Sequence, residues 1–212
     1  MNPFGWMIAV GAMAIGFGAT DAGAQPPLDR ATPEQRKLFE EIRPLILRAA
    51  EPPFPKLADS EEGWFWTTSA RMTPLLHAHA YSKDPAFLEA FVPLMEHVLS
   101  QRFIHPTRPE WSGWWNYKDA SRGQAMIDHD ALVFFIPAML FAREVRGAPA
   151  LQARFGAKAE AWMKDAEAGI RYWDARGCWH DLDEQTGWYA SYFDYPDTRT
   201  GRLLKREDVY AG

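Results

Sequence analysis

The chain has 212 residues and a net charge of −5 at pH 7, so its electrostatics give no reason to expect nucleic acid or an acidic membrane surface as a partner. Its single cysteine, Cys178, excludes an internal disulfide. Tryptophan is abundant, with 10 residues, and most of them lie outside the periodic helical stretches. Such a surplus in loops is unusual for core packing alone, and it favours a ligand that stacks on aromatic rings.

The sequence pattern of residues 1–24 predicts a secretory signal peptide. The run Trp6–Gly18 is apolar and small, and Ala22-Gly23-Ala24 before Gln25 fits a small-x-small cleavage site. The segment departs from the usual pattern because no Lys or Arg precedes the apolar run, which is short and glycine-rich for a membrane span. We therefore expect a periplasmic or secreted domain over residues 25–212, without stable membrane insertion after cleavage; a retained anchor is the alternative.

The first helix of this domain is predicted to begin after Thr32 as N-cap, with Pro33 in its first turn and a bend at Pro44. One face carries charges, so the helix should lie on the outside of the domain. The opposite face is apolar at steps of 4, 3 and 4 residues and should be buried; it comprises Leu38, Ile42, Leu45 and Ala49.

A second helix with few charges, typical of an inner element, is predicted from near Ser69 or Thr73. The acidic and aromatic segment 59–66 before it is expected to be a loop. After a short turn, Asp84-Pro85 should open a third helix with a broad apolar face.

The stretch from Trp111 to Arg146 is the most informative part of the sequence. It begins as a loop crowded with aromatic and charged residues and continues as a helix in which residues 131–142 carry no charge. A helix that is apolar all round has to be buried. Pro137 should bend it. Three ionisable residues, Asp128-His129-Asp130, stand where the loop meets the helix.

The last helix, predicted from about Pro149 to Trp173, shows the clearest amphipathic pattern. Its apolar positions step by 4, 4, 3, 4, 4 and 3 residues and comprise Leu151, Phe155, Ala159, Trp162, Ala166, Ile170 and Trp173. A second aromatic loop follows over residues 179–195. Within it, residues 181–187 are expected to form a turn, since they lack the full pattern of a calcium loop.

Amphipathic outer helices thus start near residues 33, 85 and 149, and apolar inner helices alternate with them. Connections from inner to outer helices are short, whereas those from outer to inner helices are long and aromatic. This pattern predicts an all-α domain, an α/α toroid of two concentric layers with its elaborate loops at one end.

The segment Leu75–Leu88, LLHAHAYSKDPAFL, resembles the short turn and "D-P-x-F/Y-L" restart of the six-hairpin (α/α)6-toroid superfamily, and residues 141–151 are similar more loosely. That superfamily includes glycoside hydrolases, polysaccharide lyases and uronate epimerases, with a cavity at the N-terminal ends of the inner helices. The chain resembles about half such a toroid, and its third hairpin lacks an inner helix. We therefore expect a missing C-terminal half, a partner or an oligomer to cover one flank.

Two mechanisms fit this resemblance. In a lyase, His129 and Tyr117 would transfer protons and Arg122 would hold a uronate carboxylate. In a hydrolase, Glu62 and Asp128 would be the two carboxylates, with Asp130 as the alternative to Asp128. Otherwise Asp130 is expected to bind the substrate. Plainer alternatives are an N-cap role for Asp128, a hydrogen bond from His129 to a loop backbone, a salt bridge from Arg122 to Asp119 or Asp128, and a solvated acidic turn at Glu62.

Four tryptophans are expected to stack on sugar rings: Trp64, Trp114, Trp115 and Trp188. No metal or other cofactor is predicted. The pair His77 and His79 points to different faces of a helix, and His79 is expected to be a core residue. The sequence therefore predicts an exported carbohydrate-active enzyme, a polysaccharide lyase or glycoside hydrolase acting on an oligo- or polysaccharide, with a uronate-containing one included. The alternative is a non-catalytic helical module that binds glycans or another protein.

Overall fold

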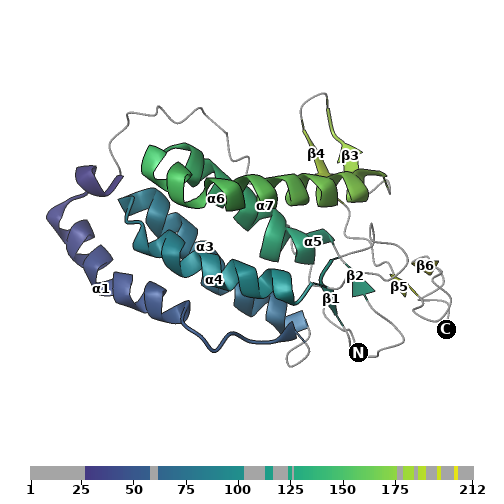
Figure 1. Ribbon diagram of the computed structural model, residues 1–212, viewed down its shortest axis with the longest axis horizontal. Helices are drawn as coiled ribbons and strands as arrows, with labels where there is room; N and C mark the ends of the chain where they lie inside the picture. The colour runs from purple at the N-terminus through teal and green to yellow at the C-terminus, as the bar shows by residue number, and fades with distance from the viewer. Residues whose placement is uncertain are drawn as a thin grey trace, which may run out of the picture.

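The computed structural model describes residues 27–57, 62–102, 113–116, 124–125, 127–175, 179–183, 186–189, 195–196 and 203–204. Among them the all-α prediction is confirmed: long helices make up the body, and the strands are two or three residues long. Figure 1 shows α3, α4, α6 and α7 side by side, with α1 below them and the short strands at one end. Within the described part of the chain, no helix combines the length and apolarity needed to cross a membrane.

Helix α1 (Pro33–Ala49) follows the short 3-10 helix η1 (Pro27–Arg30) and begins as predicted. Thr32 Oγ1 accepts a hydrogen bond from the backbone N–H of Gln35, and Gln35 Oε1 accepts one from that of Thr32. This reciprocal pair satisfies two N–H groups that the first helical turn leaves free.

The prediction that the apolar face of α1 is buried is wrong. Leu38, Ile42 and Leu45 are 57%, 39% and 59% exposed. The helix is instead anchored by Phe39, whose ring packs against those of Tyr81 and Phe87. An ion pair of 2.6 Å between Arg43 Nη2 and Asp84 Oδ2 lies on the same side and fixes the rotation of the helix.

Helix α3 (Glu62–Ser82) begins earlier than predicted, so residues 62–66 are helical and not part of a loop. Trp64 and Phe65 both have 0% exposure, and their burial outweighs the weak helical signal of the acidic, glycine-containing sequence around them. Residues 58–61 lie outside the described part. Met72 and Leu75 of this helix are fully buried. Its predicted place in an inner layer stays a prediction.

Helix α4 (Ala86–Ser100) starts after Asp84, whose Oδ1 accepts a hydrogen bond of 2.9 Å from the backbone N–H of Ala86. Its predicted apolar face is buried. A tight turn joins it to α3, and Lys83 in that turn adopts a left-handed conformation with φ 58°. The second hairpin consists of α6 (Ile136–Arg146) and α7 (Pro149–Ala175), with a similarly short turn at Gly147 and Ala148.

A π-helical turn (Ala131–Phe135) joins the single-turn helix α5 (Ile127–Asp130) to α6. It closes with a hydrogen bond from the backbone N–H of Ile136 to the carbonyl of Ala131. Pro137 follows directly. Proline has no N–H and its ring crowds the carbonyl four residues earlier, so a widened turn relieves this contact. The core here includes Val133, Phe134 and Phe141, while Ile136 is exposed at 44%.

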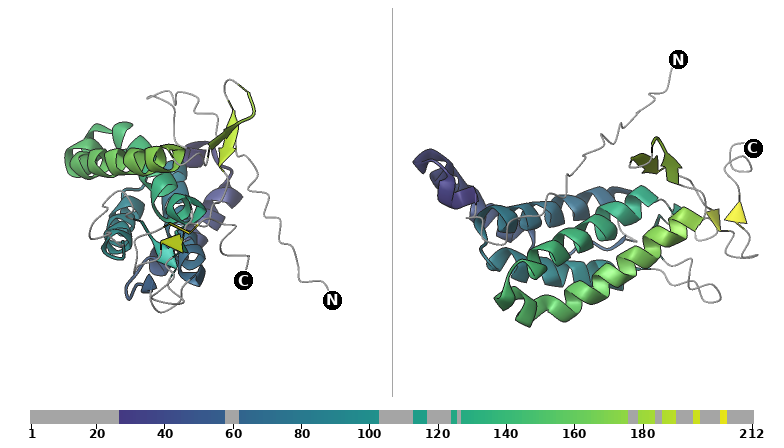
Figure 2. Two further views of the ribbon diagram at one scale, coloured as in Figure 1. Left: turned by 90° about the vertical axis from the view of Figure 1, so that its right-hand side faces the viewer. Right: turned by 90° about the horizontal axis from the view of Figure 1, so that it is seen from above.

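Figure 2 shows the two hairpins stacked in parallel. Ion pairs join them at a nearly constant sequence offset. Two link α4 to α7, Glu89 with Arg154 and Glu96 with Lys158, and a third links Arg102, just after α4, to Asp165 of α7; the offsets are 65, 62 and 63 residues. Between the other two helices, His79 bonds Glu144 at an offset of 65. Thus α3 matches α6, and α4 matches α7, as a repeated unit.

Three antiparallel strand pairs lie at one end: β1 (Trp115–Asn116) with β2 (Gln124–Ala125), β3 (Trp179–Asp181) with β4 (Gly187–Tyr189), and β5 (Tyr195–Pro196) with β6 (Leu203–Leu204). In the connection between β3 and β4, Asp183 Oδ1 accepts a hydrogen bond of 2.8 Å from the backbone N–H of Thr186. Residues 184 and 185 of the predicted turn lie outside the described part.

Candidate functional site at the N-terminal ends of α3 and α5

The first turns of α3 and α5 meet through a stacked pair of rings. The Phe65 ring and the His129 imidazole lie 3.8 Å apart between centroids, with 11° between their planes. Since the two helices run parallel, their N-terminal ends open on the same end of the molecule, next to β1 and β2 (Figure 1). Helix N-termini favour anionic groups. This end is therefore the best-defined candidate site among the described residues.

His129 lies beneath the surface of this end. It is 1% exposed, because Phe65 covers one face of its ring. Its backbone N–H donates to Asp128 Oδ1 at 3.0 Å. A ring so covered does not reach a ligand in this arrangement, and the bond to Asp128 comes from the backbone and not from the imidazole.

Asp130 is committed to the protein itself. Its Oδ1 accepts a hydrogen bond of 3.2 Å from the backbone N–H of Trp114, and its Oδ2 accepts one of 3.1 Å from Trp173 Nε1. Gly113 fits closely here, since a Cβ at that position would lie 3.2 Å from both carboxylate oxygens and would require a small shift of the Asp130 side chain. Asp130 is 4% exposed and holds the backbone of Trp114 and the side chain of Trp173. It is not open to a substrate, so this structure does not support its predicted role in substrate binding.

Burial raises the pKa of Asp130 to about 7, although the hydrogen bonds from Trp114 and Trp173 and the charge of Arg102 act to lower it. Asp128 is the half-buried carboxylate of the triplet. Its position at the first turn of α5 makes it the ionisable side chain of Asp128-His129-Asp130 with most access to solvent.

Two of the predicted sugar-stacking tryptophans are core residues. Trp64 and Trp114 have 0% exposure. The indole N–H of Trp64 donates to the carbonyl of Pro55 at 2.8 Å, and that of Trp114 donates to the carbonyl of Val98 at 2.6 Å. A ring without accessible surface cannot stack on a ligand, so the prediction is wrong for both residues.

Sequence reasoning overlooked a more suitable ring, that of Trp66. It is 45% exposed and directly follows Phe65 in the first turns of α3. The exposed positions around it are Gly63, Thr67 and Ala70, which places Trp66 on a solvent-facing side of α3 lined by small residues. Helical spacing could have found it, because positions 63, 66, 67 and 70 share one face.

The remaining predicted site residues are not tested. Tyr117 and Arg122 lie outside the described residues. Glu62, Trp115 and Trp188 are placed in α3, β1 and β4 by their backbone alone.

A second charged cluster lies at the other end of α3 and α6, and the sequence did not reveal it. Glu144 Oε2 accepts hydrogen bonds from His79 Nδ1 at 3.0 Å and from Lys83 Nζ at 2.7 Å. Arg143 contacts its other oxygen. Burial acts to raise the pKa of Glu144, but the bonds from His79 and Lys83 prevail and lower it to about 2. His79 is thus a partnered core residue, as expected.

No group of three or more His, Cys, Asp or Glu side chains that could hold a metal ion occurs among the described residues. A scan against protein-family models, a search of curated proteins and a search of solved structures each returned no match.

Proposed function

We propose that the chain is part of an α/α toroid and acts as an exported carbohydrate-active protein of the polysaccharide lyase or glycoside hydrolase type. The observation that carries this proposal is the stack of Phe65 on His129, which brings the N-terminal ends of two parallel inner helices together. The parallel stacking of the hairpins at offsets of 62 to 65 residues supports the same architecture. Residues 1–24 remain our proposed export signal.

In this proposal the substrate is an oligo- or polysaccharide, with uronate-containing ones included. Asp128 transfers the proton at the mouth of the site, and Trp66 offers its exposed ring to a sugar. Tyr117 and Arg122 stay in their predicted roles as base and carboxylate-binding group of a lyase. Glu62 stays as the second carboxylate of a hydrolase.

A second candidate function is a non-catalytic module that binds glycans or another protein. The burial of His129 favours it, because the imidazole that was predicted to transfer protons is not open to a ligand in the described structure. Trp66 would keep its role as a contact surface in either case.

The test is to incubate the purified protein with neutral and uronate-containing polysaccharides. A lyase releases unsaturated uronate ends that absorb in the near ultraviolet, whereas a hydrolase releases reducing ends without that absorbance. Asp128→Asn should lower turnover at least about 100-fold with little change in glycan binding. Asp29→Asn, at an exposed position of η1, is the matched control.

Trp66→Ala should weaken glycan binding about tenfold. Binding that depends on Trp66, with turnover absent on every polysaccharide, would establish the binding module. If the protein neither turns over nor binds any of the glycans, both carbohydrate proposals are wrong.

A further inference from the structure

Helix α1 exposes a continuous apolar stripe. Leu38, Ile42 and Leu45, the face that the sequence predicted to be buried, are 57%, 39% and 59% exposed. Exposed single apolar residues are common on proteins, but a contiguous line of large ones marks an interaction surface. These three residues follow steps of 4 and 3, which is the spacing of the contact positions in a two-helix coiled coil.

An open groove runs along the stripe and shares Leu38 and Ile42 with it. Its volume is about 420 Å³, and its other walls include Ile46 of α1 and Pro74, His77 and Tyr81 of α3. Leu45, the most exposed of the three, is not among the lining residues and stands next to the groove. A projecting side chain beside a hollow is the arrangement in which two copies of one surface interlock about a two-fold axis.

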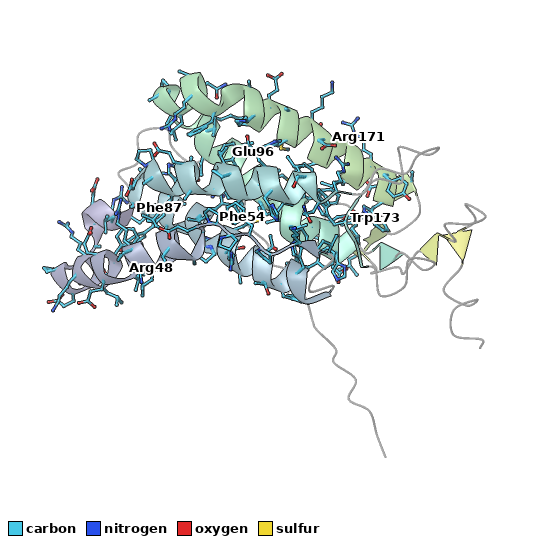
Figure 3. The ribbon with its side chains drawn as sticks, turned by 60° about the horizontal axis from the view of Figure 1, so that its bottom comes forward. Arg48, Phe54, Phe87, Glu96, Arg171 and Trp173 are labelled. Atoms are coloured by element: carbon cyan, nitrogen blue, oxygen red, sulfur yellow. The ribbon has the colours of Figure 1, made fainter. Side chains whose placement is uncertain are left out.

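The charges beside the stripe are self-complementary. Glu34, Glu41 and Arg48 recur every seven residues, so they form one line along the flank of α1 that faces away from α3. All three are exposed. Among the described residues no ion pair involves Glu41 or Arg48. Figure 3 labels Arg48 on α1, and Trp173 lies towards the opposite end of the helices.

An antiparallel pair of α1 helices brings the apolar stripes together and opposite charges side by side in the same register. With the two-fold axis between residues 43 and 44, Ile42 faces Leu45 of the second copy, and Leu38 faces Ala49. The same register brings each Glu41 next to the Arg48 of the other copy, because equivalent flanks meet in an antiparallel pair. A parallel pair would place the apolar residues Phe39 and Ile46 opposite these charges instead.

We propose that this face is the interface of a homodimer, in which α1 of one copy packs antiparallel on α1 of the second copy and Leu45 enters the neighbouring groove. The groove lies along the C-terminal half of α3, whereas Phe65 and His129 lie at its N-terminal end. Dimerisation therefore leaves the candidate site of both copies open. The inference does not depend on the carbohydrate proposal.

Sedimentation velocity of the purified full chain tests the interface. The protein should sediment as a dimer at tens of micromolar, and Leu45→Glu should raise the dissociation constant at least about tenfold by placing a charge in the contact. Leu182→Glu is the matched control, because Leu182 is 71% exposed on the β3–β4 turn. A monomeric wild type, or a dimer that Leu45→Glu does not weaken, would overturn the proposal.

Charge reversal tests the register. Glu41→Arg and Arg48→Glu each place like charges at both contacts, so each variant alone should be monomeric. In an equal mixture, however, one variant carries basic side chains at positions 41 and 48 and the other carries acidic ones. Both contacts then join opposite charges, so a mixed dimer should form. A mixture that stays monomeric would contradict the antiparallel register, even if the wild type is a dimer.

Discussion

The indole N–H of Trp173, near the end of α7, donates to Oδ2 of Asp130 across 3.1 Å. Asp130 also accepts a hydrogen bond from the backbone N–H of Trp114. The side chain at the end of α5 thus connects α7 to the segment that contains Trp114. A side chain with such a position influences stability through its protonation.

Stability should depend on pH through Asp130. Its pKa is raised from 3.8 to about 7 in the folded protein, so between these values the unfolded chain has released a proton that the folded protein retains. The free energy of unfolding should therefore fall as the pH rises from about 4 to about 7, and level off above. Urea denaturation across this range measures it. Asp130→Asn should remove this slope, and a slope unchanged in the variant would refute the assignment.

Glu144 should act in the opposite direction at lower pH. Its pKa falls from 4.5 to about 2 on folding, so its contribution is complete above pH 4.5 and is lost as the pH falls towards 2. Glu144→Gln should destabilise the protein by about 2 kcal/mol at neutral pH, since His79 and Lys83 lose a charged acceptor. It should also reduce the fall in the free energy of unfolding between pH 4.5 and pH 2, the acid limb of the stability curve. Glu160→Gln, at an exposed position of α7, should leave the acid limb unchanged.

Two nearby tryptophans should behave differently when truncated. Trp64→Ala removes a fully buried ring and its bond to Pro55, and should lower the free energy of unfolding by about 3–5 kcal/mol. Trp66→Ala removes a ring that is 45% exposed and should lower it by less than about 1 kcal/mol. Thermal and urea unfolding of the two variants compare them directly. Equal losses would show that Trp66 is a core residue and unsuitable as a ligand contact.

Alanine should be tolerated at one glycine of α7 and not at another. A Cβ at Gly169 would lie 2.5 Å from Cε1 of Phe135, in the π-helical turn, so Gly169→Ala should destabilise the protein by about 1–3 kcal/mol. A Cβ at Gly156 meets only the end of the flexible Gln152 side chain at 2.8 Å. Gly156→Ala should be neutral or stabilise by up to about 1 kcal/mol, as the higher helix propensity of alanine predicts. Denaturant midpoints decide between these outcomes.

The sequence predicted those helices whose ends and faces are encoded locally. The capping pair at Thr32 and the long apolar repeat of α7 are determined by residues a few positions apart, so both could be read without tertiary contacts. The start of α3 could not, since residues 62–66 become helical only because Trp64 and Phe65 are buried against other segments. The rotation of α1 likewise depends on Asp84 and Phe87, which lie more than a helix away in sequence.

Asp128 and His129 lie in the short helix α5, and the His129 ring stacks on Phe65 in the first turn of α3. That these residues form a functional site stays a prediction. A tryptophan looks the same in the sequence whether its ring faces a ligand or the core. Only its contacts in the folded protein distinguish a ligand-binding ring from a core ring. The indole N–H groups of Trp64 and Trp114 are satisfied by backbone carbonyls, which no local pattern indicates.

The π-helical turn Ala131–Phe135 sets the angular phase between the acidic triplet and the apolar helix that follows it. An α-helix advances about 100° per residue, so the extra residue of a π turn shifts everything before it by roughly that angle relative to everything after it. With an uninterrupted α-helix of the same sequence, the side chain of Asp130 would be turned away from Trp173 whenever Phe141 kept its place in the core. Loss of a single residue between 131 and 135 would thus rotate the side chains of Asp128, His129 and Asp130 away from their present partners, while the packing of α3, α4, α6 and α7 stays intact.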